Sequence, residues 1–403
     1  MNTMRIEIPS HVEFIIKKLN DHGYEAFAVG GCVRDTLLGR CPGDWDITTS
    51  ARPEQVKELF RRTIDTGIQH GTVTIMLDKT GYEVTTYRID GEYEDGRHPK
   101  QVQFTSDLLE DLRRRDFTIN AMAYSHETGI VDAFGGMEDL KNRTIRCVGN
   151  AMERFEEDAL RILRAIRFSA QLDFAIEEKT MEGISVIAPN LAKVSRERVQ
   201  MELTKLLCSD HPEHICQVYE TGISPYVSDE FSRLNWQQAE VSGDLPTEKY
   251  VRWAAFLRCS VPKKDGQEKD REEAGKTAVS ILRSLKLDNE TISRVRTLVS
   301  WSGVSMPEDP VAVRRAMSRM EPEVWDSLCK LNGYGSAIEA ITESIKRAGD
   351  CLDLKHLAVN GRDLIQAGVR PGRDMGDILN KMLQEVLTYP EHNQKDILMK
   401  KFL

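Results

Sequence analysis

The sequence predicts an α+β fold, in which a small mixed sheet in the N-terminal part is followed by helices alone. Up to about residue 149, short β-rich runs such as AFAVG and GTVTIML alternate with helical segments. Beyond Asn150, strand signals become rare and apolar residues recur at helical spacing to the end. A chain of 403 residues is also long for a single core, so two to four domains are expected.

The N-terminal part opens with a helix predicted over Val12–His22, where Ile15, Ile16 and Leu19 form an apolar stripe. Strands and helices then alternate. The expected order is a strand at AFAVG, a helix over Cys32–Leu38, a strand over Trp45–Thr49, a helix from Pro53 to Phe60, and strands at GTVTIML and YEVTTYR.

A glycine pair, Gly30 and Gly31, stands directly before the second of these helices. Glycines at a helix start leave backbone N–H groups open to an anion, and their missing side chains let a phosphate come close. Arg34 follows Gly31 by one helical turn, where its guanidinium could reach the same phosphate. The pattern therefore indicates a triphosphate site.

Two carboxylates, Asp44 and Asp46, follow within the same stretch. On a strand over Trp45–Thr49 their side chains would point to one face, because residues i and i+2 do. Paired carboxylate oxygens are ligands that Mg²⁺ prefers. Either motif alone is common in turns and loops, but together they predict nucleotide chemistry on a metal. Glu83, in a later strand, is a possible third carboxylate, although a solvated strand position explains it more simply.

The run RRRDFTIN places Arg114, Arg115, Asp116, Thr118 and Asn120 around one phenylalanine. Arginines near a helix C-terminus are favoured in any case. Arginine is also the side chain that clamps a phosphate in a bidentate manner, and we predict Arg115 as that clamp.

The segment RFEEDALRILRAIRF carries Asp158 and Arg161 three residues apart on one predicted helix. Aspartate accepts hydrogen bonds and arginine only donates. Cytosine and adenine each present an amine beside an acceptor ring nitrogen, so this pair fits both bases. Uracil and guanine present a carbonyl and a ring N–H instead, and each mismatch would cost roughly 1–3 kcal/mol. The pair therefore predicts a site that accepts CTP and ATP and refuses UTP and GTP.

Composition limits the class of protein. The sequence has no apolar run near 18 residues and no signal-like N-terminus, so we expect a cytoplasmic protein without a membrane span. Its eight cysteines lie scattered without a Cys-x-x-Cys motif, which is typical of reduced thiols. The net charge of −9 does not exclude a nucleic-acid partner, because binding depends on where arginines cluster.

Taken in order, GGCVRD with DWD, RRDFTIN, EDALRILR and SRERV resemble the motifs of the bacterial class II CCA-adding enzymes, which are tRNA nucleotidyltransferases of the DNA polymerase beta-like superfamily. The resemblance covers nearly the whole chain. It implies a catalytic head over 1–149, a helical neck with the nucleotide-recognition helix over 150–208, a body over 209–306 and a tail over 307–403 that contacts tRNA.

The resemblance also implies roles for individual residues. Asp44 and Asp46 would bind Mg²⁺ and be catalytic. The nucleotide would be contacted by Gly31, Arg34, Arg115, Asp158, Arg161, Arg164 and Arg167. The substrates would be CTP, ATP and tRNA, and the oligomeric state, monomer or homodimer, is left open.

Other functions stay open at this point. Relatives that add only CC lack the flexible loop before the second motif, which is present here at Asp90–Pro99. Poly(A) polymerases carry a longer basic segment than GIQHGTVTIML. An A-only adding enzyme or a poly(A) polymerase is the nearest alternative, and a catalytically silent RNA-binding protein is a more distant one. A small-molecule nucleotidyltransferase would not need the long helical tail.

Overall fold

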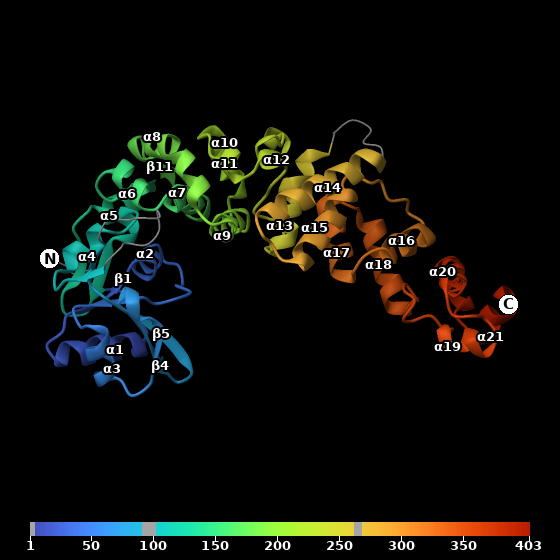
Figure 1. Ribbon diagram of the computed structural model, residues 1–403, viewed down its shortest axis with the longest axis horizontal. Coiled ribbons are helices and arrows are strands. Elements are labelled where there is room, and N and C mark those ends of the chain that lie inside the picture. The colour runs from blue at the N-terminus through green and yellow to red at the C-terminus, as the bar shows by residue number, and fades with distance from the viewer. Residues whose placement is uncertain (1–4, 91–101, 262–267) are drawn as a thin grey trace. The chain divides into compact units, whose positions relative to one another are not determined.

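The computed structural model describes residues 5–90, 102–261 and 268–403, and its contacts divide the chain into two compact units. The first unit runs to Trp236 and includes Ser284–Lys286, and the second comprises Gln237–Arg283 and Leu287–Leu403. Strands occur only in the first unit among the described residues (Figure 1), which confirms the predicted fold class. The single division falls inside the segment expected to be the body, so the four-part division stays a prediction.

The head is organised on a seven-stranded sheet. Every neighbouring pair of strands is antiparallel except β2 and β5, which are parallel. From one edge to the other the strands are β3 (Thr63–Gly67), β4 (Thr72–Leu77), β5 (Thr80–Thr86), β2 (Ile47–Thr49), β1 (Ala26–Val29), β8 (Met122–Ser125) and β9 (Gly129–Asp132).

The strand after the carboxylate pair is shorter than the sequence predicts. It begins at Ile47, the first residue that pairs with both Ala28 on β1 and Val84 on β5. Asp44 and Asp46 therefore precede the strand, although the backbone N–H of Val29 still donates to the carbonyl of Asp46 at 3.0 Å. That both carboxylates face one side stays a prediction.

Helices cover this sheet. They are α1 (Ser10–Asp21), α2 (Gly31–Leu37), α3 (Pro53–Leu59), α4 (Leu108–Arg113) and α5 (Gly136–Lys141). Two short strand pairs complete the head region, β6 (Arg88–Asp90) with β7 (Val102–Phe104), and β10 (Thr144–Ile145) with β11 (Ala175–Ile176). Apart from Asp90, the loop over Asp90–Pro99 lies outside the described residues.

The rest of the first unit is helical. It contains α6 (Ala151–Glu157), α7 (Leu160–Leu172), α8 (Glu178–Ile187), α9 (Arg196–Leu207), α10 (Cys216–Glu220), α11 (Ser224–Val227) and α12 (Asp229–Ser232). The helix predicted over RFEEDALRILRAIRF is thus two helices, α6 and α7, with Asp158 between them.

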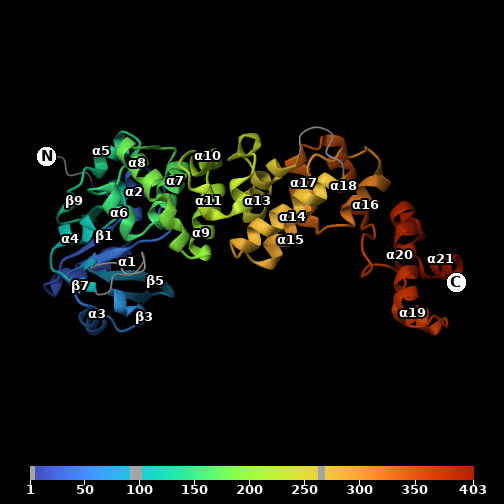
Figure 2. The same ribbon diagram turned by 45° about the horizontal axis from the view of Figure 1, so that its top comes forward.

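The second unit is helical throughout its described part. It contains α13 (Lys249–Leu257), α14 (Glu268–Ser284), α15 (Asn289–Ser300), α16 (Pro310–Met317), α17 (Pro322–Asn332), α18 (Ser336–Ala348), α19 (Gly361–Gln366), α20 (Arg373–Thr388) and α21 (Lys395–Phe402). Helix α15 packs against both α13 and α17 (Figure 2). No helix in the described ranges is long and apolar enough to cross a membrane.

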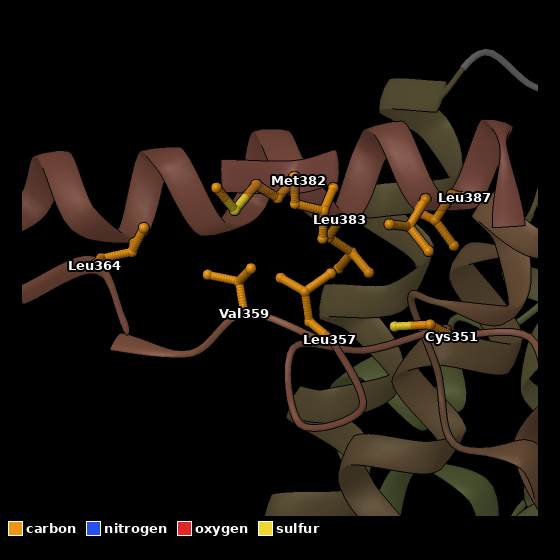
Figure 3. Close-up of a cluster of buried hydrophobic side chains, with 9 residues drawn as sticks. Cys351, Leu357, Val359, Leu364, Met382, Leu383 and Leu387 are labelled. Carbon is orange, nitrogen blue, oxygen red and sulfur yellow. The ribbon is translucent and has the colours of Figure 1, made fainter. Parts of the chain in front are cut away.

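The C-terminal end of the chain has an apolar core of its own. Met382, Leu383 and Leu387 on α20 face Leu357 and Val359 from the preceding segment (Figure 3). Other members of this cluster are Cys351, Leu364, Val386 and Leu398. The periodic apolar residues that predicted a packed helical tail therefore meet one another in this cluster.

Truncation of Met382 is expected to destabilise this core. Met382 is fully buried, so Met382→Ala removes buried methylene groups and leaves a cavity, at a cost of about 2–5 kcal/mol. Urea unfolding monitored by circular dichroism measures the loss. Lys381→Ala, at the exposed neighbouring position, is the matched control and should change the unfolding free energy by less than about 0.5 kcal/mol.

Candidate active site

The glycine pair lies where α2 begins, next to an arginine from a distant segment. Gly30 has a φ of +81°, which favours glycine. A Cβ at Gly30 would also lie 3.0 Å from Nη1 of Arg115. Glycine is thus needed here both for the backbone conformation and for the close approach of the Arg115 guanidinium.

Arg34 lies on the same helix, and its side chain is buried. Its Nε and Nη2 donate to the two oxygens of Asp35 at 2.8 and 3.0 Å, and its Nη1 donates to Oδ1 of Asn120 at 2.6 Å. Its Nη2 also lies near Gly31, where a Cβ would be 3.7 Å away. The structure therefore places Arg34 beside the glycine pair with a fixed guanidinium.

The carboxylate pair lies next to Arg115. Loss of hydration raises the pKa of Asp46, the positive charge of Arg115 opposes this rise, and the charge of Asp44 adds to it. Both aspartates lie in the irregular segment before β2. The charges of Arg115 and Asp44 thus both act on Asp46.

Glu83 joins this group from β5. Because β2 and β5 are parallel and Ile47 pairs with Val84, Glu83 lies beside the start of β2. Loss of hydration and the charges of Asp46 and Asp44 raise the pKa of Glu83. The sequence alone favoured a solvated strand position for Glu83, and only the strand pairing reveals the neighbouring carboxylates.

These carboxylates fit a magnesium ion by their chemistry. Loss of hydration raises the pKa of both Asp46 and Glu83, and a neighbouring carboxylate adds to the rise in each case, a repulsion that a divalent cation would relieve. Within the described part of the chain, no group of three or more His, Cys, Asp or Glu residues lies so that it could hold a metal ion. Mg²⁺ is typically bound by one or two carboxylates together with waters and substrate phosphates, so a carboxylate pair is the expected arrangement.

The residues that follow α4 connect the head to α7. Asp116 accepts hydrogen bonds from Nδ2 of Asn120 at 3.1 Å and from Nε and Nη2 of Arg164 at 2.8 and 2.6 Å. Burial would raise the pKa of Asp116, but Arg164 and Asn120 hold it well below its ordinary value. Since Asn120 also bonds Arg34, a continuous polar chain runs from the glycine pair to the first turns of α7.

Asp158 lies between α6 and α7 rather than inside one helix. Its Oδ1 accepts the backbone N–H of Leu160 at 3.0 Å, and its Oδ2 accepts Nη2 of Arg198 at 2.7 Å. Arg198 belongs to α9, and no local sequence pattern predicts this pairing. The prediction that Asp158 and Arg161 share one helix is therefore wrong.

Arg161 lies in the first turn of α7. Its Nη1 donates to Oε2 of Glu157 at 2.6 Å and its Nη2 donates to the carbonyl of Arg114 at 3.1 Å. Segment 114–116 therefore holds two arginines of α7, Arg161 through a carbonyl and Arg164 through Asp116.

Arg167 is the most deeply placed of the predicted nucleotide contacts. It is buried, and its guanidinium bonds Glu202 and Gln171. The guanidinium carbon lies 3.8 Å from the centre of the Phe168 ring, around which Arg34 and Arg164 also gather at 5.0 and 5.5 Å. Arg167 thus packs on the same phenylalanine ring that Arg34 and Arg164 approach.

Three family models match the chain. The model described as "Poly A polymerase head domain" matches residues 26–146, "Probable RNA and SrmB- binding site of polymerase A" matches residues 173–233, and "tRNA nucleotidyltransferase domain 2 putative" matches residues 272–402. The first of these matches covers the glycine pair, the carboxylates and Arg115.

Whole proteins match over nearly the full length. The CCA-adding enzyme of Geobacillus kaustophilus is 39% identical over 95% of this chain and 93% of its own. That of Ligilactobacillus salivarius is 37% identical over 96% of this chain and 94% of its own. The crystal structure of the Bacillus stearothermophilus CCA-adding enzyme in complex with CTP superposes with a TM-score of 0.76, at 32% identity and 98% coverage of both chains. Because relatives that are 37% and 39% identical match 96% and 95% of this chain, it belongs to the family of CCA-adding enzymes.

Proposed function

We infer that this chain adds C, C and A, without a nucleic-acid template, to the 3′ end of tRNA, using CTP and ATP and releasing pyrophosphate. The observation that carries this inference is the closeness of Arg115, whose charge acts on Asp46, to Gly30, in a chain of this family. A relative solved with bound CTP supports the nucleotide. We propose that the enzyme works in the cytoplasm.

The head would bind the triphosphate and the metal. Asp44 and Asp46 would hold Mg²⁺, with Glu83 as a third nearby carboxylate. When bound, Mg²⁺ would activate the 3′ hydroxyl and neutralise the pyrophosphate that leaves. Arg34 and Arg115 would orient the phosphates beside Gly31, since their guanidinium groups already lie against the glycine pair.

The junction of α6 and α7 would read the base. A carboxylate has about four acceptor sites, so Asp158 can keep its bond to Arg198 and still accept the amine of cytosine or adenine. Arg161 would donate to the ring nitrogen after turning from Glu157. Arg164 and Arg167 would lie on the same side of the nucleotide. Arg164 is held by Asp116 and Arg167 by Glu202.

Incorporation of each labelled nucleotide into a tRNA that lacks its last three residues tests this function. We expect addition of two C and one A in the presence of Mg²⁺, with UTP and GTP refused. A long A tail without C would identify a poly(A) polymerase, and a single A without C an A-only adding enzyme. The absence of any transfer would leave an RNA-binding protein built on this fold.

Replacement of Glu83 tests the third carboxylate. Glu83→Gln removes negative charge beside Asp46 and Asp44, and activity at limiting Mg²⁺ is expected to fall by about 10- to 100-fold. A titration of activity against Mg²⁺ measures the change, and higher Mg²⁺ should restore part of it. Glu58→Gln, an exposed glutamate of α3, is the control. An unchanged Mg²⁺ profile for Glu83→Gln would exclude Glu83 from the metal site.

A further inference from the structure

Helix α4 carries a carboxylate into the interior of the head. Leu108 and Leu112 pack into the apolar cluster that contains Phe27, Val29, Tyr87 and Ala123. Asp111 lies between them in sequence and has no exposed surface. A fully buried aspartate is unusual unless it is paired, because burial disfavours its charge.

The two oxygens of Asp111 bind different parts of the head. Oδ1 accepts Nε and Nη2 of Arg114 at 2.9 and 2.7 Å and the backbone N–H of Arg88 at 3.4 Å. Oδ2 accepts the hydroxyl of Thr48 at 3.1 Å and Nη2 of Arg115 at 3.4 Å. The first oxygen therefore bonds Arg114 and the backbone of Arg88, whereas the second bonds residues next to the candidate active site.

The partners of the second oxygen connect Asp111 to the proposed site. Thr48 follows Asp46 by two residues and is the middle residue of β2. Arg115 places its Nη1 against Gly30, and its charge acts on Asp46. The Arg115 guanidinium thus lies against Gly30 while it donates to Asp111.

Little else holds the Arg115 side chain. Within the described residues, its Nε is buried without a hydrogen-bond partner. Asp111 is the side chain that bonds its guanidinium there. An arginine that is free to rotate loses rotamer entropy when it binds a ligand, and a fixed guanidinium avoids that cost.

We propose that Asp111 is a positioning residue: its buried carboxylate fixes Arg115 against Gly30, and through Thr48 it fixes the strand that follows the carboxylate pair. The triphosphate then meets an arginine that is already oriented. This inference rests on the proposed function, in which Arg115 contacts the triphosphate.

A double-mutant cycle between Asp111 and Arg115 tests the proposal. Asp111→Asn, Arg115→Ala and the double variant are compared by KM and kcat for CTP on a tRNA that lacks CCA, with melting temperatures measured in parallel. We expect Asp111→Asn to raise KM for CTP about tenfold in the wild-type background. In the Arg115→Ala background the same change should raise KM less than about twofold, because the group it positions is gone.

A change in the same helix that leaves Arg115 untouched is the matched control. Asp107 caps α4, accepting the backbone N–H of Leu109 at 2.8 Å. Asp107→Ala should lower the melting temperature but leave KM within about twofold of wild type. If Asp111→Asn does not fold, Asp111→Ser replaces it in the cycle, since it also removes the carboxylate oxygen that accepts from Arg115.

The outcomes separate this inference from the proposed function. If Asp111→Asn, or its substitute, raises KM for CTP by the same factor in both backgrounds, the positioning role is overturned. A KM for Asp107→Ala as high as that of Asp111→Asn would also overturn it. If the wild-type protein adds no C at all, the proposed function itself is wrong. An active wild-type enzyme with an additive cycle would overturn only the inference about Asp111.

Discussion

Replacement of Asp46 by alanine is expected to lower the rate of C addition by at least about 10³-fold. The change removes one of two carboxylates proposed to hold Mg²⁺, and the charge stabilisation that a catalytic metal supplies is worth several kcal/mol. Asp44→Ala should have a similar effect, because the two aspartates occupy the same turn before β2. Single-turnover incorporation of labelled CTP into a tRNA that lacks CCA measures the rate.

The loss of rate must be separated from a loss of folding or of tRNA binding. Asp65→Ala removes a carboxylate from the edge strand β3, where its partner is Lys57, and should leave the rate within about twofold of wild type. Both active-site variants should keep the melting temperature and the affinity for tRNA. A variant of Asp46 that is folded and still transfers C at near the wild-type rate would exclude the proposed metal site.

Replacement of Asp158 by alanine is expected to abolish most of the discrimination between bases. The wild-type site should reject UTP and GTP by about a hundredfold or more, because each would leave buried polar groups unpaired. Without the carboxylate, the acceptor that distinguishes an amine from a carbonyl is missing, and the preference should fall to within about tenfold. Competition between CTP and UTP on the same tRNA measures the ratio directly.

Two further variants show which contact of Asp158 matters. Arg198→Ala breaks the ion pair with Asp158 but keeps the carboxylate, so selection should weaken less than in Asp158→Ala. Glu156→Ala changes an exposed residue of α6 close to the same junction and should leave selection unchanged. Full discrimination against UTP and GTP in the Asp158→Ala variant would show that the base-reading argument is wrong.

The local patterns of the sequence determined the fold class and the chemistry of the site. The β-rich runs before residue 149 and the helical period after Asn150 gave an α+β head and a helical remainder, and the structure confirms both. Gly30 and Gly31 before a helix, and Asp44 with Asp46 at the predicted strand that follows, pointed to phosphate and metal. These features can be predicted from the sequence because secondary-structure propensity, apolar periodicity and residue chemistry depend on a few neighbouring residues.

The tertiary structure alone decided which residues meet across the chain. The parallel pairing of β2 with β5 brings Glu83 beside Asp46, and α9 brings Arg198 to Asp158. Strand pairing also set the start of β2 at Ile47. The burial of Asp111 behind Arg115 depends on how α4 packs under the sheet. Strand register and helix packing are set by contacts between residues far apart in sequence. Local sequence patterns do not predict such contacts.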